Sequence, residues 1–275
     1  MDESSRVTSI RSDRVTVVRA LHARQGRRKA GRFLIEGPQS VRSAFAAGVL
    51  LHDLFVAEDT GGALSDLIDA ARQAGVRLTW VTSPVMSAMA ETPHPQGVLA
   101  IADLLPESGL DTVMSAPGPV IVLEAVSDPG NVGTVIRTAD ACGAAGVLLT
   151  PESADVHGGK VVRSTAGSLF HLPVVPAVPV ADAVAAAHRH GRSVAVATGE
   201  ATTDLFTATR SGEVTDRTCW IVGSEAHGVS QESRDLADVT IAIPMTGRAE
   251  SLNAAVAAAV VLYVTWAAQN DPASP

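Results

Sequence analysis

The sequence predicts an α/β fold in two consecutive units. Short apolar runs of β-type residues alternate with segments of helical periodicity along most of the chain, which is typical of sheets covered by helices. A stretch rich in proline and glycine, residues 104–119, interrupts the alternation and indicates a connection. We therefore expect a smaller α/β domain over residues 1–105, a linker over 106–118 and a second α/β domain over 119–270.

The first unit contains a regular series of apolar runs, bounded by glycine, proline or polar residues. Val15, Val18 and Leu21 recur at helical spacing and predict a helix over residues 12–24. Pro38 suits the first turn of a helix, because its missing N–H would have no partner there. The other expected elements are, in order, strand 32–36, helix 38–47, strand 51–57, helix 64–74, strand 76–81, helix 83–90 and strand 97–102.

The second unit repeats the alternation with strands that are apolar at nearly every position. Continuous apolar runs are typical of parallel strands whose two faces are both covered by helices. Sheets of this kind bind ligands beyond the carboxyl ends of their strands. The expected strands are 120–124, 147–150, 193–198, 218–222 and 239–243, and the expected helices are 131–142, 159–165, 180–190 and an apolar helix that begins near residue 254.

Composition excludes several classes of protein. Hydrophobic residues make up 46% of the 275 residues and charged residues 18%, as in a globular protein. Cys142 and Cys219 lie far apart with no Cys-x-x-Cys or histidine cluster nearby, so we expect neither a disulfide framework nor a metal site. The first residues lack the apolar core of a secretory signal. The longest apolar run, 254–268, is shorter than the roughly 18–20 residues that span a bilayer, so we expect a cytoplasmic protein without a membrane segment.

Charge is distributed unevenly along the chain. The net charge is −8, but residues 1–42 contain ten basic and four acidic side chains, which gives +6 for this segment and −14 for the remainder. Segregated positive charge is the electrostatic pattern of phosphate binding and favours RNA as a partner. A solvated basic helix in an arginine-rich protein is the alternative. The candidate RNA-binding residues are Arg24, Arg27, Arg28, Lys29, Arg32, Lys160 and Arg163.

Polar residues follow three of the expected strands, where a parallel sheet would bind its ligand. Asn131 is placed to cap the start of a helix, and Arg137 follows about two turns later. An arginine near a helix N-terminus is suited to binding an anion or a ribose phosphate. Gly223 ends a later strand and is followed by Glu225. Asn253 opens the long apolar helix, where side-chain oxygens can accept from unpaired N–H groups.

These three segments resemble, in order and spacing, the three signature motifs of the SpoU/TrmH-type RNA 2′-O-ribose methyltransferases of the SPOUT superfamily. The matching residues are Asn131 and Arg137, Gly223 and Glu225, and Ser251, Leu252 and Asn253. The resemblance covers about residues 118–268. Residues 33–41 also resemble the opening of a ribosomal-protein-like substrate-binding domain that precedes many of these enzymes. One departure is Ser224-Glu225-Ala226, where the family usually has Asn-Glu-Gly.

The resemblance implies a C-terminal parallel-sheet domain with a trefoil knot, S-adenosylmethionine as methyl donor, and a homodimer formed through that domain. It implies that the smaller N-terminal domain binds RNA, and the two-domain layout favours 23S ribosomal RNA. The catalytic residues that it implies are Arg137, Asn131, Glu225, Ser251 and Asn253. The cofactor-binding residues that it implies are Thr198, Gly223, Ile243, Met245, Ser251 and Leu252.

Arg137 is the residue that the resemblance places beside the ribose. A guanidinium group remains protonated far above neutral pH, and lowering its pKa by about 5 units would cost ~7 kcal/mol. We therefore expect Arg137 to act as a cation that stabilises the developing alkoxide and binds the neighbouring phosphate, rather than as a base.

Three other functions are alternatives to ribose methylation. A nucleotide-dependent oxidoreductase is disfavoured because the chain contains no Gly-x-Gly sequence, so the dinucleotide-binding fingerprint is missing. A non-catalytic RNA-binding or ribosome-assembly protein is disfavoured by the complete set of motif residues, but the sequence does not exclude it. Methylation of an RNA base on the same fold stays open as well.

Overall fold

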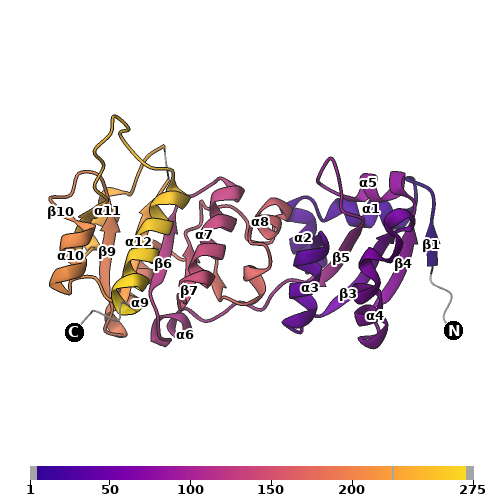
Figure 1. Cartoon of the computed structure of the whole chain (residues 1–275), viewed down its shortest axis with the longest axis horizontal. Helices are drawn as coiled ribbons and strands as arrows, with labels where there is room; N and C mark the ends of the chain where they lie inside the picture. The colour runs from indigo at the N-terminus through magenta and orange to yellow at the C-terminus, as the bar shows by residue number, and fades with distance from the viewer. Residues whose placement is uncertain (1–4, 225, 271–275) are drawn as a thin grey trace. The chain divides into compact units, whose positions relative to one another are not determined.

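A computed structural model describes residues 5–224 and 226–270 of the chain (Figure 1). The chain divides into two compact units. The N-terminal unit comprises the chain up to Pro106 together with His157–Phe170, and the C-terminal unit comprises Glu107–Val156 and the chain from His171 onward. Each unit is an α/β layer structure, which confirms the predicted fold class.

The N-terminal unit is built on a five-stranded sheet with the order β1-β4-β3-β5-β2. Strand β5 is antiparallel to β2 and β3, whereas the β1–β4 and β3–β4 pairs are parallel. The strands are β1 Ser5–Val7, β2 Arg32–Glu36, β3 Leu51–Ala57, β4 Arg77–Val81 and β5 Val98–Asp103. The helical segments between them are α1 Asp13–Ala20, α2 Arg24–Ala30, α3 Pro38–Ala46, the 3-10 helix Glu58–Leu64, α4 Ser65–Gln73 and α5 Ser83–Met89.

The basic segment of this unit folds as two helices, not as the single helix predicted over residues 12–24. The first, α1, ends at Ala20, and α2 begins at Arg24. Gly26 explains the close approach of the two helices, because a Cβ at this position would lie 1.8 Å from the Ala20 carbonyl oxygen. Glycine is a poor helix former in general, so local propensity did not predict α2.

The C-terminal unit contains a seven-stranded sheet with the order β10-β12-β9-β11-β6-β7-β8, and every pair in it is parallel. Its strands are β6 Val120–Glu124, β7 Gly146–Leu149, β8 Val174–Val175, β9 Ser193–Ala197, β10 Thr203–Asp204, β11 Thr218–Gly223 and β12 Val239–Ala242. Its helices are α6 Leu110–Ser115, α7 Pro129–Ala141, α9 Val180–Arg189, α10 Leu205–Ser211, α11 Gln231–Leu236 and α12 Ala254–Asn270.

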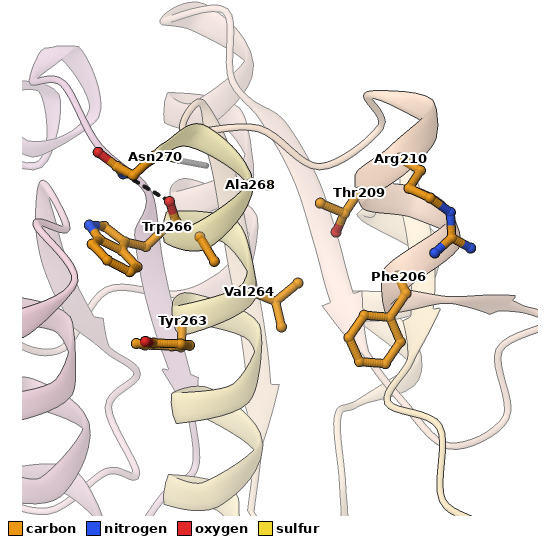
Figure 2. A pocket seen from close by; sticks show the side chains of 9 residues that line it. Phe206, Thr209, Arg210, Tyr263, Val264, Trp266, Ala268 and Asn270 are labelled. Atoms are coloured by element: carbon orange, nitrogen blue, oxygen red, sulfur yellow. Dashed lines mark hydrogen bonds between the residues drawn. The ribbon is translucent and has the colours of Figure 1, made fainter. Parts of the chain in front are cut away.

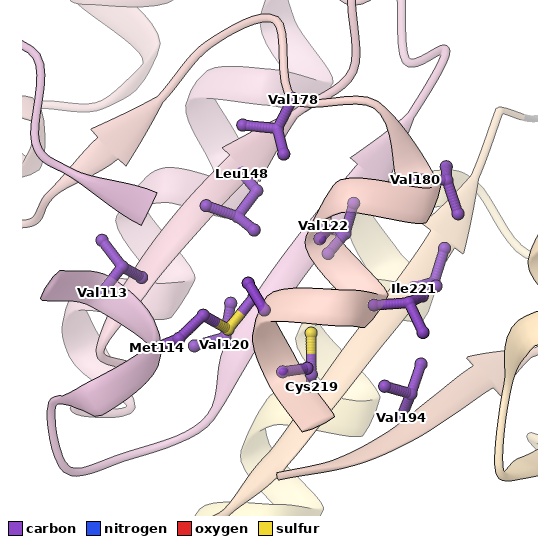
Figure 3. Packing of buried hydrophobic residues seen from close by; sticks show 14 of the residues in the cluster. Val113, Met114, Val120, Val122, Leu148, Val178, Val180, Val194, Cys219 and Ile221 are labelled. Atoms are coloured by element: carbon purple, nitrogen blue, oxygen red, sulfur yellow. The ribbon is translucent and has the colours of Figure 1, made fainter. Parts of the chain in front are cut away.

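Helices cover both faces of this sheet. Helix α12 packs against α7, β11 and α10. Figure 2 shows Val264 of α12 and Thr209 of α10 directed into the space between these two helices. On the other face, α6 and α9 pack over an apolar cluster that includes Val122, Cys219 and Ile221 (Figure 3). Successive strand residues point to opposite faces. Trp220, between Cys219 and Ile221, accordingly donates from Nε1 to Thr265 Oγ1 of α12 over 3.1 Å.

The segment expected to be a linker over residues 106–118 is part of the C-terminal unit from Glu107 onward. Val113 and Met114 of α6 are buried in its core. Arg192 is 2% exposed, and its guanidinium donates hydrogen bonds to the carbonyl oxygens of Met114, Ala116 and Gly118. The proline and glycine content indicated an irregular segment, but it did not indicate that a buried arginine would bind three of its carbonyl groups.

A segment of the expected second domain belongs instead to the N-terminal unit. Helix α8, Gly159–Ser164, contacts β2, and the 3-10 helix Ser168–Phe170 contacts α3. The ring of His157 makes an edge contact with that of Phe33, at 4.8 Å between centroids. The chain passes through this segment between β7 and β8. The N-terminal unit is therefore formed by two separate stretches of the sequence, not by one continuous stretch.

Candidate active site

The side chains of Asn131 and Asn253 meet in the C-terminal unit. Asn253 Nδ2 donates a hydrogen bond to Asn131 Oδ1 over 3.2 Å. Asn253 Oδ1 also accepts from the backbone N–H groups of Ala255 and Val256, and thereby caps the start of α12. The first and third predicted motifs, 122 residues apart in sequence, are therefore in direct contact.

Helix α7 begins two residues before the position predicted from the sequence. Pro129 occupies the first turn, and Asp128 is the N-cap, with Oδ1 accepting from Asn131 N over 3.0 Å. Asn131 was expected to cap this helix. It lies in the first turn instead, since Asp128 takes the capping position and leaves the Asn131 side chain directed to Asn253.

Three parallel strands bring Thr198, Gly223 and Ile243 to one edge of the sheet. Strand β9 lies between β12 and β11, and the carboxyl ends of parallel strands share an edge. Thr198 directly follows β9, and its backbone N–H donates to the Ile241 carbonyl over 3.0 Å. Gly223 ends β11 next to Glu124, the last residue of β6. The cofactor-binding residues predicted after these strands thus lie along one sheet edge.

The loop between β12 and α12 has an exposed backbone. Among the described residues, the backbone groups of residues 243–252 make no hydrogen bond with protein partners. Met245 is 38% exposed, and Leu252 and Ile243 are half-buried. Free backbone donors and acceptors beside apolar side chains match the chemistry of an adenosine, which has hydrogen-bonding ring edges and apolar ring faces. This part of the chain therefore fits S-adenosylmethionine.

The turn after β11 is unusually tight. A Cβ on Gly223 would lie 2.0 Å from the Gly228 carbonyl oxygen, so only glycine fits at this position. Gly228 N donates to the Ser224 carbonyl over 2.8 Å. The buried Ser224 hydroxyl has no hydrogen-bond partner in the part of the chain that the structure describes. Glu225, predicted to be catalytic, lies outside the described residues.

Arg137 is exposed on α7, about two turns after the start of the helix. Its guanidinium makes no hydrogen bond or ion pair with any of residues 5–224 and 226–270. A cation without an internal partner is available to an anionic ligand. Ser251 is also exposed and lies two residues before the cap of α12.

Four of the predicted RNA-binding residues share one short helix, and three of the four are exposed. Arg24, Arg28 and Lys29 of α2 are exposed and have no ion pair within the described chain. Arg32 lies at the start of β2, with Nε 3.6 Å from Asp103 Oδ1. Lys160 is exposed at the start of α8. The exposed cations of α2 are therefore accessible to an anionic ligand.

Two other arginines of that prediction have internal roles, and we correct the prediction for both. Arg27 is 5% exposed, and its guanidinium donates to the carbonyl oxygens of Leu21 and His22. Arg163 Nη1 lies 3.1 Å from both Glu36 Oε2 and Glu91 Oε2. Sequence position alone did not distinguish these residues from their exposed neighbours, because their partners lie far along the chain or on a turn.

Glu124 is a buried carboxylate at the same sheet edge, and it was not among the site residues predicted from the sequence. It is 9% exposed, and its Oε2 accepts hydrogen bonds from Ser230 N and Ser233 Oγ. The available signal was a charged residue that ends an otherwise apolar strand, since acidic residues are seldom buried without partners.

Neither a metal site nor a membrane segment is found in the described chain. Within residues 5–224 and 226–270, no three His, Cys, Asp or Glu side chains are grouped so as to hold a metal ion. In the same residues, no helix has both the length and the apolar character needed to cross a bilayer.

Two family models match the chain. Residues 118–263 match the SpoU rRNA Methylase family, and residues 12–100 match the MRM3-like substrate binding domain. Both matches confirm the resemblance inferred from the motifs and from residues 33–41.

Characterised relatives resemble the chain over almost its full length. The 23S rRNA (guanosine(2553)-2′-O)-methyltransferase RlmP of Bacillus subtilis is 33% identical, with 94% of this chain and 97% of the relative covered. The 23S rRNA (uridine(2479)-2′-O)-methyltransferase of Streptomyces viridochromogenes is 34% identical, with 87% and 84% covered. The crystal structure of an AdoMet-bound rRNA methyltransferase from Sinorhizobium meliloti superposes with a TM-score of 0.83 and 28% identity, covering 95% of this chain and 97% of that one. The chain belongs to the SpoU rRNA methylase family.

Proposed function

We propose that this protein methylates a ribose 2′-hydroxyl of 23S ribosomal RNA. The observation that carries the proposal is the hydrogen bond between Asn131 and Asn253, which joins two motifs at the sheet edge that also holds Thr198 and Gly223. Two relatives that match most of the chain are named as 23S rRNA 2′-O-methyltransferases, which supports this substrate.

In this proposal the loop over residues 243–252 binds the cofactor, with Ile243, Met245, Ser251 and Leu252 as contact residues beside Thr198 and Gly223. When bound, S-adenosylmethionine supplies an electrophilic methyl group on a sulfonium centre. The loop's unpaired backbone groups support this role, because they can bind the adenine edge without side-chain chemistry. Ile243 and Leu252 would cover the ring faces and exclude water.

Arg137 is the proposed catalytic cation. Its exposed guanidinium has no acidic partner within the described chain, so its positive charge is available to the substrate. Two parallel N–H groups can bind the phosphate next to the target ribose, while the charge stabilises the 2′-oxygen as it loses its proton. The proton passes to the phosphate or to water, since a protonated guanidinium is not a base.

The other predicted catalytic residues orient the reactants in this scheme. Asn131 and Asn253 fix each other through their amide groups and so hold α7 against the start of α12. Ser251 lies at the mouth of the same loop, with its hydroxyl available to substrate or cofactor. The role of Glu225 rests on its motif position. Correct orientation of the reacting oxygen supplies a large part of the rate enhancement.

RNA binding is assigned to the N-terminal unit. Arg24, Arg28 and Lys29 of α2 would contact phosphates, with contributions from Arg32 and Lys160. Phosphate contacts position RNA without choosing a sequence. An rRNA substrate would place the enzyme in the cytoplasm.

Homodimerisation through the C-terminal unit is also proposed. An apolar groove of about 560 Å³ runs between α7 and α12 and is lined by Thr134, Thr138 and Val256. Val256 and Tyr263 are 48% and 59% exposed, and exposed apolar patches of this kind mark interfaces. A second groove, between Phe206 of α10 and the last turns of α12, continues the apolar surface (Figure 2). The trefoil knot stays a prediction from family membership.

Mapping of 2′-O-methyl groups tests the proposed function in the cell. We expect 23S rRNA from cells that carry the gene to contain one 2′-O-methyl nucleotide that is absent after deletion and restored by the wild-type gene. Restoration should fail with Arg137→Ala. An unchanged 23S map, or loss of a methyl group from a base, would refute the proposal.

A further inference from the structure

Glu124 connects the end of β6 to the start of α11. Its Oε2 accepts two hydrogen bonds, from Ser230 N at 3.1 Å and from Ser233 Oγ at 2.7 Å. Ser233 is fully buried, and Ser230 is the N-cap of α11. Ser230 Oγ accepts in turn from Ser233 N over 3.1 Å. One carboxylate oxygen therefore anchors the beginning of this helix.

This connection lies between two of the predicted motifs. Glu124 directly precedes the segment that leads to α7 and Asn131. Ser230 lies two residues after Gly228, which closes the turn over residues 223–228 (the second-motif turn). Glu124 and Gly223 are also paired in the sheet register of β6 and β11. The backbone of Glu124 thus pairs with Gly223 at the start of this turn, and its side chain binds Ser230 and Ser233 beyond the end of the turn. Both ends of the turn are therefore held to β6.

The turn has little room to adapt if this anchor is lost. Gly223 approaches Gly228 so closely that a methyl group would overlap its carbonyl. Close-packed segments have low compressibility and transmit strain to their neighbours. A shift of the start of α11 would therefore displace Gly223, which belongs to the proposed cofactor site.

We propose that Glu124 is a positioning residue that sets the affinity for S-adenosylmethionine by holding the second-motif turn in its binding geometry. This inference rests on the proposed function. Glu124 acts through Ser230 and Ser233 and takes no part in methyl transfer. Hydrogen bonds to an ionised group are stronger than neutral ones, which suits a carboxylate to this task.

Removing the acceptor should weaken cofactor binding without abolishing chemistry. Glu124→Ala leaves the Ser230 N–H and the buried Ser233 hydroxyl without their acceptor, and the free-energy cost of an unpaired buried hydroxyl favours local rearrangement. We expect the Kd for S-adenosylmethionine to rise about tenfold, equivalent to ~1.4 kcal/mol. At saturating cofactor, kcat should stay within about threefold of wild type, as expected when only binding is lost.

Glu124→Gln is the conservative variant that separates positioning from other roles. Both hydrogen bonds end on the same oxygen, and the amide oxygen of glutamine can occupy that place. The Kd of this variant should stay within about threefold of wild type, because the charge assistance is lost but both acceptor contacts are kept. Ser233→Ala removes one of the two contacts and should raise the Kd by about threefold.

Thr218→Val is the matched control. Thr218 is fully buried at the opposite end of β11, where its Oγ1 accepts from Thr215 N over 2.9 Å. Valine removes this acceptor at similar volume, so the melting temperature should fall. The Kd for S-adenosylmethionine should not change, because the lost contact lies at the other sheet edge.

Calorimetric titration of the full-length proteins with S-adenosylmethionine, paired with thermal melting, tests the inference. Support requires weak binding by Glu124→Ala, near-normal binding by Glu124→Gln and unchanged binding by Thr218→Val. Wild-type affinity in Glu124→Ala overturns it, as does equal weakening in Glu124→Gln or Thr218→Val. If Glu124→Ala does not fold, Ser233→Ala decides: an unchanged Kd overturns the inference. If wild type itself does not bind the cofactor, the proposed function fails with it.

Discussion

Asn253 of α12 donates a hydrogen bond from Nδ2 to Oδ1 of Asn131 on α7, while its own Oδ1 caps α12. The Asn253 amide thus has two tasks: its nitrogen contacts the first motif, and its oxygen caps the helix. The contact fixes the start of the apolar helix against the helix that carries Arg137. Any change at Asn253 must therefore be interpreted as a change in capping, in contact between the motifs, or in both.

The two tasks of Asn253 can be separated by substitution. Asn253→Ser keeps an oxygen that caps α12, but its hydroxyl is too short to reach Asn131 Oδ1 and so loses the contact between motifs. We expect a melting temperature close to that of wild type with kcat/KM reduced at least tenfold. Asn253→Ala should lose both tasks and about 1 kcal/mol of stability. Equal activity in Asn253→Ser and wild type would show that the contact does not serve catalysis.

Arg137→Ala should reduce kcat by about 10²–10³-fold, because the alkoxide loses its stabilising cation. Its affinity for S-adenosylmethionine should be nearly unchanged. Arg137→Lys should also be poor, since an ammonium cannot make a forked contact with phosphate. Single-turnover methylation and cofactor titration together measure both effects. Arg189→Ala, which removes an exposed arginine paired with Asp111, provides a control that should retain activity. Near-normal turnover by Arg137→Ala would exclude the proposed role.

The exposed cations of α2 should govern the salt dependence of RNA binding. Replacing Arg24, Arg28 and Lys29 by glutamine removes up to three phosphate contacts, so the slope of log K against log salt should become shallower by about 2–3. Cofactor affinity should not change. Arg72→Gln removes a cation that already pairs with Asp69 and should leave the slope as in wild type. A slope in the triple variant equal to that of wild type would remove α2 from the RNA-binding surface.

The exposed apolar surface of α12 should hold two copies of the chain together. A Val256→Glu, Tyr263→Glu variant should sediment as a monomer under conditions in which wild type is dimeric, since a charge in an apolar interface is not compensated. Val17→Glu places the same charge at a residue of α1 that is 59% exposed and should leave the sedimentation unchanged. A monomeric wild-type protein would contradict the proposed dimer directly.

Cys219 should be unreactive in the folded protein. Burial raises the pKa of its thiol to about 12, and burial raises the pKa of Cys142 as well. The raised pKa means that the folded state favours the neutral Cys219 thiol. The contribution of this preference to folding stability is complete below about pH 9 and is lost as the pH rises toward about 12. A thiol reagent at pH 8 should label neither cysteine until the protein unfolds. Rapid labelling of Cys219 in native protein would show that β11 is accessible.

Much of the second unit could be predicted because its signals are local. The apolar runs that form β6, β9 and β11 end at polar residues or glycine, and the structure places their ends within about one residue of the prediction. Strands β8 and β10 have two residues each and depend on pairing with β7 and β12, so no local pattern identifies them.

The nature of the candidate site could be predicted, but its internal contacts could not. Motif order identified Asn131 and Asn253, whereas their mutual hydrogen bond depends on how α7 and α12 pack. Arg27 and Arg163 read as RNA-binding cations, yet their guanidinium groups bind carbonyls and glutamates within the N-terminal unit. Such partners are distant in sequence or defined by tertiary geometry, and residue type alone does not reveal them.

Nucleoside mass spectrometry after methylation in vitro tests the proposed chemistry most directly. Purified protein is incubated with 23S rRNA and S-adenosylmethionine that carries an isotopically labelled methyl group, and the RNA is then digested to nucleosides. We predict that the label appears in a single 2′-O-methylated nucleoside and disappears when Arg137→Ala replaces wild type. Label on a base, or no label although RNA and cofactor both bind, would contradict ribose methylation by this site.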